Sequence, residues 1–229
     1  MTPEFSIIIP VWKEESVIPR TIEHIRGLQS AAGAEIIVVD GDPAGKTMEI
    51  ARCAGVTTTI SERGRGNQMN HGAALAAGNI LIFLHADTRL PLDALALIDT
   101  AMQDESYMAG AFDLAIDSER PIFRLIEKAA SLRSRLTKIP YGDQAVFMRK
   151  AFFNKLGGFS DIPIMEDVEI MQRIKKQGGK ICIIDRAVRT SSRRWEREGI
   201  VYTTLRNWLL ITLYLLGVKP EKLVRFYQQ

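Results

Sequence analysis

The sequence predicts an α/β protein with a mainly parallel central sheet and helices on both of its faces. Over the first hundred residues, short apolar runs alternate with amphipathic stretches, which is the pattern of successive βαβ units. Runs such as Ile7-Ile8-Ile9 and Ile80-Leu81-Ile82-Phe83-Leu84 show no polar alternation. We therefore expect both faces of these strands to be buried under helices.

The first half of the chain is predicted to contain four strands separated by helices. Apolar residues recur at helical spacing after the first strand, at Val17, Ile18, Ile22, Ile25 and Leu28. Gly33 belongs to the break that follows, and Gly78 is expected to close a later helix. The predicted strands are 5–10, 35–40, 56–60 and 80–84, and the predicted helices are 15–28, 46–54, 67–77 and 92–102.

The second half is less regular. The predicted strands are 109–116, 144–148 and 181–184, and the predicted helices are 122–136 and 168–176. No linker rich in Pro, Gly or Ser divides the chain, and 229 residues with 46% hydrophobic content suit one core. We expect a single domain over 1–229, with a nucleotide-binding half (1–100), an acceptor half (101–199) and C-terminal helices (200–229).

Composition narrows the function classes. A formal charge of +3 with 25% charged residues is too small to indicate a nucleic-acid partner. Cys53 and Cys182 lack metal-ligand spacing and are interpreted as buried thiols of a reducing compartment. Because Met1 leads into an apolar strand without a basic flank or cleavable hydrophobic region, we expect no signal peptide and a cytoplasmic location.

Polar residues follow three of the predicted strands. The first strand continues into Pro10-Val11-Trp12-Lys13-Glu14-Glu15, the second ends at Asp40-Gly41-Asp42, and the fourth ends at His85-Ala86-Asp87. Ligands of open parallel sheets bind beyond the carboxyl ends of the strands. One acidic residue in such a loop is as readily a helix cap or a turn residue, but three ends in register favour a binding site.

His85 and Asp87 lie two residues apart, so both side chains point to the same side of an extended segment. An imidazole and a carboxylate suit Mn²⁺ or Mg²⁺ bridging a diphosphate, with phosphate and water completing the coordination. If this pair is considered without the other motifs, the simpler interpretation is that His85 is a packed histidine and that Asp87 caps the turn before Pro91.

The loop after the first strand excludes two classes of nucleotide-binding protein. No glycine lies between Pro10 and Glu15, which argues against a dinucleotide oxidoreductase and a P-loop enzyme.

Two further segments begin helices. The segment 64–70 is glycine-rich and basic, and it opens a helix that can attract an anion, although glycines there also make ordinary turns. Glu166 and Asp167 precede another helix, where they either complement its dipole or supply a general base.

These segments together resemble the family-two glycosyltransferases of the GT-A fold, and most closely a short bacterial branch of that family. The resemblance covers essentially the whole chain and depends on the order and spacing of its motifs. The matching stretches are Ser6-Ile7-Ile8-Ile9-Pro10 with Glu14-Glu15, Ile37-Val38-Val39-Asp40-Gly41, Gly64-Arg65-Gly66-Asn67-Gln68-Met69-Asn70, Phe83-Leu84-His85-Ala86-Asp87-Thr88, Gly142-Asp143-Gln144 and Glu166-Asp167.

The resemblance implies a donor site. Nucleotide-sugar contacts are expected from Pro10, Glu14, Asp40, Arg65, Asn70, Asp87, Arg194 and Trp195. Asp87 corresponds to the second acid of the family's DXD metal motif, whose first position is His85 here, so the implied cofactor is Mn²⁺ or Mg²⁺ held by Asp87 and His85. Arg193-Arg194-Trp195 is similar to a shortened Arg-Trp motif, with Ser191-Ser192 where its leading glutamine would stand.

The resemblance also implies the chemistry. Asp167 is expected to be the catalytic base that deprotonates a hydroxyl acceptor, with Glu166 orienting that acceptor and Gly142, Asp143 and Gln144 forming the acceptor-side loop. The implied reaction is metal-dependent transfer of a hexosyl or related group from a nucleotide-diphosphate sugar, with inversion. Two rivals are a sugar nucleotidyltransferase, although the basic glycine loop it needs after the first strand is missing, and a non-catalytic nucleotide-sugar binding domain.

The C-terminal stretch 208–218 is almost wholly apolar and follows a basic patch at 189–206. Eleven residues are too few to cross a bilayer, which needs about 20 in a helix. Contact with a membrane surface that holds a lipid-linked acceptor is one expectation, at the inner face of the membrane. Packing against the domain or formation of a homodimer is the other.

Overall fold

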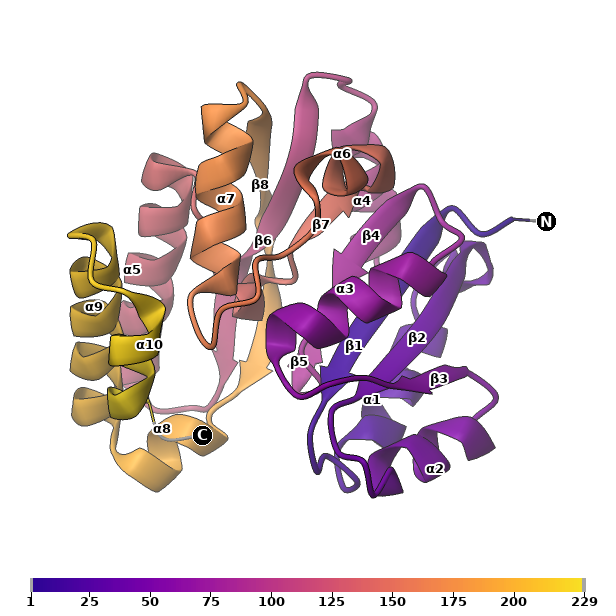
Figure 1. Ribbon diagram of the computed structural model, residues 1–229, viewed down its shortest axis with the longest axis horizontal. Helices are drawn as coiled ribbons and strands as arrows, with labels where there is room; N and C mark the ends of the chain where they lie inside the picture. The colour runs from indigo at the N-terminus through magenta and orange to yellow at the C-terminus, as the bar shows by residue number, and fades with distance from the viewer. Residues whose placement is uncertain (1, 228–229) are drawn as a thin grey trace.

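The strands, which lie between Phe5 and Ser191, form one sheet. The structure is a computed structural model that describes residues 2–227, and within them the sheet has eight strands in the order β3-β2-β1-β4-β7-β6-β8-β5 (Figure 1). The strands are β1 (Phe5–Val11), β2 (Ala34–Asp40), β3 (Thr57–Ile60), β4 (Ile80–Phe83), β5 (Thr88–Arg89), β6 (Tyr107–Asp117), β7 (Phe147–Arg149) and β8 (Lys180–Ser191).

Helices connect these strands and continue to the C-terminus. The α-helices are α1 (Ile18–Arg26), α2 (Lys46–Cys53), α3 (Arg65–Leu75), α4 (Ala94–Met102), α5 (Pro121–Thr137), α6 (Lys150–Leu156), α7 (Glu166–Lys176), α8 (Arg193–Glu198), α9 (Ile200–Leu215) and α10 (Pro220–Leu223). Short 3₁₀ turns are η1 (Ala31–Gly33), η2 (Gly142–Gln144) and η3 (Val224–Phe226).

The sheet is mainly parallel, as predicted. β1 pairs in parallel with β2 and β4, β2 with β3, and β6 with β8, whereas β7 and β5 run antiparallel to their neighbours. The carboxyl ends of β1, β2 and β4 therefore meet at one edge of the sheet. This edge is where α/β sheets place their ligands.

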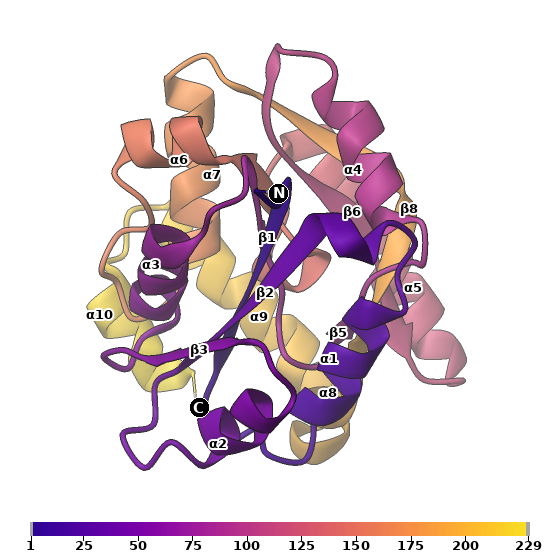
Figure 2. The same cartoon turned by 90° about the vertical axis from the view of Figure 1, so that its right-hand side faces the viewer.

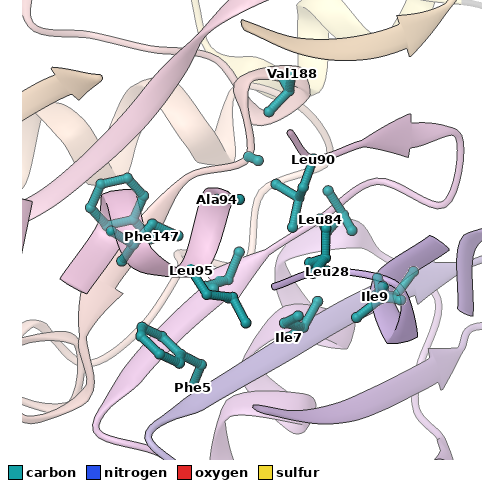
Figure 3. Packing of buried hydrophobic residues seen from close by; sticks show 14 of the residues in the cluster. Phe5, Ile7, Ile9, Leu28, Leu84, Leu90, Ala94, Leu95, Phe147 and Val188 are labelled. Carbon is teal, nitrogen blue, oxygen red and sulfur yellow. The ribbon is translucent and has the colours of Figure 1, made fainter. Parts of the chain in front are cut away.

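Both faces of the sheet are covered, which confirms the prediction made from the apolar runs. Ile7 and Ile9 of β1 face a core that includes residues of α1 and α4, whereas Ile8 faces a second core that includes residues of α3, α6 and α7. Figure 2 shows these two groups of helices on opposite sides of the sheet. Figure 3 shows the first core, in which Phe5, Ile7 and Leu95 pack together. Strict alternation of strand side chains sorts consecutive isoleucines into different cores.

α3 packs against the sheet at Gly72. A Cβ atom at this position would lie 2.5 Å from Ile8 Cγ2 and 3.0 Å from Val39 Cγ2. The missing side chain lets α3 approach β1 and β2, which fixes the N-terminus of α3 near the ends of these strands.

Several boundaries differ from the sequence-based expectations. The segment predicted as a strand over 144–148 is the η2 turn followed by β7, because the backbone at Ala145 is left-handed (φ 49°). β8 extends to Ser191 along β6 rather than ending near 184, and α3 ends before Gly78. β5, α6 and α8 lack a clear periodic signal and were not predicted. The apolar C-terminal stretch belongs to α9, which begins at Ile200.

The expectation of two buried thiols is wrong for Cys53. Cys53 is exposed at the end of α2, and Cys182 on β8 is partly buried; both are free thiols. α2 packs through its opposite face, where Thr47 and Ala51 are buried.

No helix in the described part of the chain combines the length and the apolar content required to cross a bilayer.

Candidate functional site

The ends of β1 and β2 are fixed to each other and to α3. Val11 pairs with Asp40 in the strand register. Gln68 of α3 donates its side-chain amide to the carbonyls of Val11 and Val39, at 2.8 and 2.9 Å. Gln68 is buried, and it holds the two strand ends and the helix start in one rigid unit.

Asp40 is fully buried in this unit. Its carboxylate accepts backbone hydrogen bonds from Asp42 at 2.9 Å and from Met48 at 3.3 Å, which connect the end of β2 to α2. Burial raises the pKa of Asp40 above its ordinary value, and the two hydrogen bonds oppose that shift. Pro10, which is partly buried, precedes Val11 in β1 and pairs with Val39. Asp40 thus shapes the strand end, and its carboxylate is not exposed to a ligand in this structure.

A pocket opens where α3, α7, the end of β4 and the η2 turn meet. Its polar lining comes from Arg65, His85, Gly142, Glu166 and Asp167, and its apolar lining comes from Met69, Phe83, Val146, Phe159 and Met171. The cavity measures about 10 Å³, which is room for about one water molecule. Four segments far apart in the sequence therefore converge on one small hollow.

Asp167 is held on one wall of this pocket. Its Oδ2 accepts a hydrogen bond from the backbone nitrogen of Gly142 at 2.7 Å, and its Oδ1 accepts one from the nitrogen of Val168 at 2.7 Å. The side chain lies in the first turn of α7, where the helix dipole stabilises negative charge. Each carboxylate oxygen keeps a second lone pair, so Asp167 can still accept a proton or a hydrogen bond.

Glu166 fixes an arginine beside Asp167. Arg65 Nη1 lies 3.2 Å from Glu166 Oε1, and the Glu166 side chain is only 4% exposed against 40% for Arg65. Burial raises the pKa of Glu166, and the charge of Arg65 opposes that shift. The pair directs a guanidinium toward the pocket from the start of α3.

His85 is a neutral imidazole. Burial and then the charges of Arg65 and Arg194 lower its pKa to about 3. The ring packs against Gly142, where a Cβ atom would lie 2.8 Å from His85 Nε2. A neutral ring keeps one nitrogen lone pair, which is the form that binds a metal ion or accepts a hydrogen bond.

Asp143 lies beside Asp167 and has an unusual proton affinity. Burial raises its pKa to about 6, with Asp167 and Asp87 adding to the shift while Arg133 and Arg65 oppose it. Its Oδ1 is buried without a hydrogen-bond partner among the described residues. A buried carboxylate oxygen without a partner requires an explanation, such as a bound water molecule or cation.

Gln144 supports this turn from inside the protein. It is fully buried, donates to the carbonyl of Phe112 at 2.8 Å, and accepts hydrogen bonds from Ser134 Oγ at 2.7 Å and Arg133 Nη2 at 3.1 Å. Its amide group is engaged with the protein, so Gln144 positions Gly142 and Asp143.

Arg193 joins two acidic strand ends. Its Nη2 lies 3.3 Å from Glu14 Oε2 and 3.2 Å from Asp87 Oδ2. Burial raises the pKa of Glu14, whereas Arg193 lowers it. Glu14 is also anchored through its backbone nitrogen, which donates to Thr47 Oγ1 at 3.1 Å. A cation from α8 thus lies between the loops that follow β1 and β4.

The donor set around Asp87 fits a cation only in part. Across residues 2–227, no three His, Cys, Asp or Glu side chains are grouped closely enough to bind a metal ion by themselves. Asp87, the neutral His85 and the orphaned oxygen of Asp143 supply the right atom types. Oxygen atoms of a bound ligand would have to complete the coordination.

Arg194 faces the C-terminal segment. Its Nη1 donates to the hydroxyl of Tyr227, and its guanidinium lies 4.8 Å from the centre of the Tyr227 ring. Arg206 of α9 approaches the same ring at 5.4 Å. Trp195 points elsewhere, stacking edge to face on Phe123 of α5 at 5.9 Å between ring centres. The phenol of Tyr227 therefore occupies the side of the site where two arginines meet.

Asn70 has a supporting position on α3. Its side-chain amide donates to the carbonyl of Phe159 at 2.8 Å and accepts from the nitrogen of Phe159 at 2.8 Å. These two bonds hold the loop before α7 against α3, so Asn70 acts on the site through that loop.

Left-handed backbone conformations flank three of the site segments. Lys13 (φ 55°) precedes Glu14, Ala145 (φ 49°) follows Gln144, and Met165 (φ 70°) precedes Glu166. This conformation is costly for residues other than glycine. Ser30 and Lys138 adopt it as well, outside these segments.

Sequence reasoning missed four residues that complete the site. Arg133 modulates Asp143 from α5, Arg193 bridges Glu14 and Asp87, and Gln68 fixes the strand ends. Tyr227 lies at the end of the described chain. Gln68 and Arg193 are within motif stretches that the sequence offered, whereas nothing in the sequence connects Arg133 or Tyr227 to this pocket.

The fold and the site define a class of protein. A parallel sheet with polar strand ends, extended by a mixed half that includes β6, β7 and β8, is the GT-A arrangement, and solved glycosyltransferases share it. A mannosyltransferase from Pyrobaculum calidifontis, solved with GDP-Man and Mn²⁺, matches 82% of this chain and 57% of its own with a TM-score of 0.65 and 21% identity. S. aureus TarS (residues 1–349), solved with UDP, matches 82% of this chain and 60% of its own with a TM-score of 0.64 and 15% identity.

The sequence assigns the family. Residues 6–157 match the model of glycosyl transferase family 2, and the chain belongs to that family. A PGL/p-HBAD biosynthesis glycosyltransferase of Mycobacterium bovis (strain BCG / Pasteur 1173P2) is 28% identical over 182 residues, covering 69% of this chain. The probable glycosyltransferase YdaM of Bacillus subtilis (strain 168) is 25% identical over 221 residues, covering 86%. The matches span 64% and 51% of the lengths of these two relatives.

Proposed function

We propose that this chain transfers a sugar from a nucleotide-diphosphate donor to a hydroxyl acceptor by a single displacement that inverts the anomeric carbon. The observation that carries the proposal is the pocket at the strand ends, where the carboxylate of Asp167 and the guanidinium of Arg65 line one hollow. A leaving diphosphate needs positive charge, and an attacking hydroxyl needs a proton acceptor.

Asp167 is the proposed base. In the reaction its carboxylate takes the proton of the acceptor hydroxyl as the hydroxyl oxygen bonds to the anomeric carbon. The bond from that carbon to the phosphate oxygen breaks, and the nucleoside diphosphate leaves with the electron pair. Gly142 and Val168, whose backbone nitrogens hold Asp167, keep it in one orientation during this step.

Arg65 and Arg194 are the proposed partners of the diphosphate. Glu166 holds Arg65 at 3.2 Å, and the charges of both arginines act on His85, so they lie at the same part of the site. A divalent cation, Mn²⁺ or Mg²⁺, would be held by Asp87 and His85 together with phosphate oxygens, with Asp143 nearby, and would supply Lewis-acid stabilisation of the leaving group. One matching mannosyltransferase was solved with Mn²⁺ and GDP-Man, which supports this assignment.

The remaining residues are assigned to the nucleoside side or to the acceptor side of the proposed site. Glu14 and Pro10 border the nucleoside side of the site, with Asp40 shaping it from beneath. Asp143, on the η2 turn next to Asp167, is assigned to the acceptor side as part of the loop that positions Gly142. A lipid-linked acceptor is the first class to examine, because apolar side chains of α9 such as Leu205 and Trp208 are exposed.

The test begins with donors. Thermal shift over a panel of nucleoside diphosphates, with and without Mn²⁺ or Mg²⁺, is expected to identify a base whose binding depends on the metal. With the matching sugar nucleotide, product analysis should detect nucleoside diphosphate. Pyrophosphate formed from a nucleoside triphosphate and a sugar phosphate would indicate a nucleotidyltransferase, and binding without turnover would indicate a binding domain.

The role of Asp167 is tested by Asp167→Asn. We expect kcat to fall about 100-fold or more while donor affinity stays unchanged. Asp99→Asn, an exposed aspartate on α4, is the matched control and should keep full activity. Unchanged turnover in Asp167→Asn would refute the assignment of the base.

A further inference from the structure

α9 has its apolar side outward. Val201, Leu205, Trp208 and Leu209 recur at helical spacing in α9, and Leu216 follows as its C-cap. All five are exposed, Leu205 at 58%, Trp208 at 55% and Leu216 at 76%. We call these five residues the α9 apolar face. The opposite side, which packs on the protein, includes the buried polar residues Thr203 and Arg206. A helix at an ordinary protein surface has the reverse arrangement.

α5 adds a second exposed apolar stripe. Ile122, Leu125, Leu132 and Leu136 are exposed at 43–76% and share one side of the helix, while Phe123 and Ser134 are buried. α5 packs on β6, and α9 packs through Leu210 on Ile164 and Leu223. Figure 1 shows both helices at the same edge of the molecule, remote from α2 and β3, and in Figure 2 both lie on the far side.

Positive charge gathers around these two helices. Residues 120–138, which are α5 with its two capping residues, carry six basic and one acidic side chains. Residues 193–227 carry seven basic and three acidic ones. Some of these basic residues belong to the site or are buried, namely Arg133, Arg193, Arg194 and Arg206. Eight others are exposed, together with two acidic residues, Glu196 and Glu221; the eight are Arg120, Arg124, Lys128, Lys138, Arg197, Lys219, Lys222 and Arg225. Apolar exposure and basic charge therefore coincide on one part of the protein.

We propose that the α9 apolar face, extended by α5, docks on the surface of an anionic lipid bilayer. Apolar side chains that enter the headgroup region gain hydrophobic free energy, and the basic residues around them are attracted to anionic lipids. Trp208 is of the type that concentrates at the membrane–water interface. α9 has 16 residues and spans about 24 Å, so it lies along a bilayer surface rather than crossing about 30 Å of hydrocarbon.

The positive charge around the α9 apolar face favours an anionic bilayer over a second copy of the chain as the partner of this surface. A symmetric dimer would place the same surface on both sides of its interface. The exposed basic residues of one copy would then face those of the other, and the repulsion would oppose association. An anionic bilayer offers the opposite charge to the same surface.

Docking also orients the active site. α8 and α9 are joined by the ion pair between Glu198 and Arg206 at 2.7 Å, and Arg194 of α8 contacts Tyr227. The helices that carry the proposed docking surface thus adjoin the residues of the donor site. A membrane-bound acceptor would reach the site without leaving the lipid surface.

The test is flotation with lipid vesicles, done without donor or acceptor, so that its result is independent of the proposed reaction. The wild-type protein is expected to float with vesicles of phosphatidylglycerol and phosphatidylcholine, and less with phosphatidylcholine alone or at high salt. The double variant Leu205→Gln/Trp208→Gln should reduce the bound fraction about tenfold. The matched double variant Leu75→Gln/Leu92→Gln, at exposed leucines outside both helices, should bind like wild type.

Three results would overturn the proposal. The first is a wild-type protein that does not bind the anionic vesicles. The second is undiminished binding by Leu205→Gln/Trp208→Gln. The third is a wild-type dimer in light scattering that this double variant converts to a monomer without any vesicle binding, which would assign the surface to a second copy. Because all four replaced residues are at least 49% exposed, circular dichroism should show both double variants folded.

Discussion

Asp167 Oδ2 lies 2.7 Å from the backbone nitrogen of Gly142, and this single hydrogen bond joins the α7 start to the η2 turn. Gly142 also lies against His85, so one glycine borders both the proposed base and the imidazole that is proposed to hold the cation. The distance between these two groups depends on a residue without a side chain.

Gly142→Ala is predicted to disturb both groups. Its Cβ atom would lie 2.8 Å from His85 Nε2 and 3.6 Å from Asp167 Oδ2, so the imidazole must move. We expect kcat/KM to fall about 10- to 100-fold, because small displacements of reacting groups have effects of that size. Gly33→Ala is the matched control, since no atom lies within 4 Å of its added Cβ. Equal activity of the two variants would contradict the prediction.

Asp143 is predicted to make stability depend on pH. Its pKa is about 6 in the folded protein against 3.8 ordinarily, so the folded state holds the proton more tightly than the unfolded state. The stability this provides is present below about pH 4 and is lost as pH rises through 6. Asp143→Asn, which cannot ionise, should exceed wild type by about 1 to 3 kcal/mol at pH 8 and by much less at pH 4.5.

Urea unfolding at the two pH values measures this difference. Asp185→Asn is the control, because the Asp185 side chain is 93% exposed. A gap between wild type and Asp143→Asn that is the same at both pH values would show that burial does not raise the pKa of Asp143.

Asp87→Ala is predicted to abolish metal-dependent nucleotide binding. His85 stands where a second acid would otherwise be, and no ready cluster of three metal ligands exists among residues 2–227 to compensate. Titration calorimetry with the nucleoside diphosphate identified by thermal shift, with and without Mn²⁺, should show the metal-dependent part of the affinity vanish. Unchanged affinity in the presence of Mn²⁺ would remove Asp87 from the metal site.

Tyr227→Phe is predicted to strengthen donor binding. The phenolic oxygen accepts from Arg194, so a diphosphate that needs this arginine must displace it. Loss of the hydroxyl should lower the Kd of the nucleoside diphosphate about threefold, in line with one hydrogen bond that need not be broken. Tyr202→Phe, on the exposed side of α9, is the control. Weaker binding by Tyr227→Phe would instead make the hydroxyl a contact of the donor.

The features that could be predicted from the sequence are those that depend on residues close together in the chain. Strand runs such as Ile7-Ile8-Ile9 predicted the parallel sheet and its two covered faces, because period and apolarity are local properties of the chain. Glu166 and Asp167 were singled out from their place before a helix and from a family motif. The exposure of Cys53 was missed, because an apolar neighbourhood in sequence does not say which side of a helix packs.

The sequence by itself determined the order of the elements, the α/β class and the short motifs at the strand ends. Only the tertiary structure decided which motifs meet: it placed Asp167 and His85 at one pocket, turned Asp40 and Gln144 inward, and brought Arg193 between Glu14 and Asp87. It also decided that the apolar side of α9 faces outward. The physical reason is that hydrogen-bond partners and exposed faces depend on contacts between residues up to 179 positions apart, and such contacts leave no periodic mark on the chain.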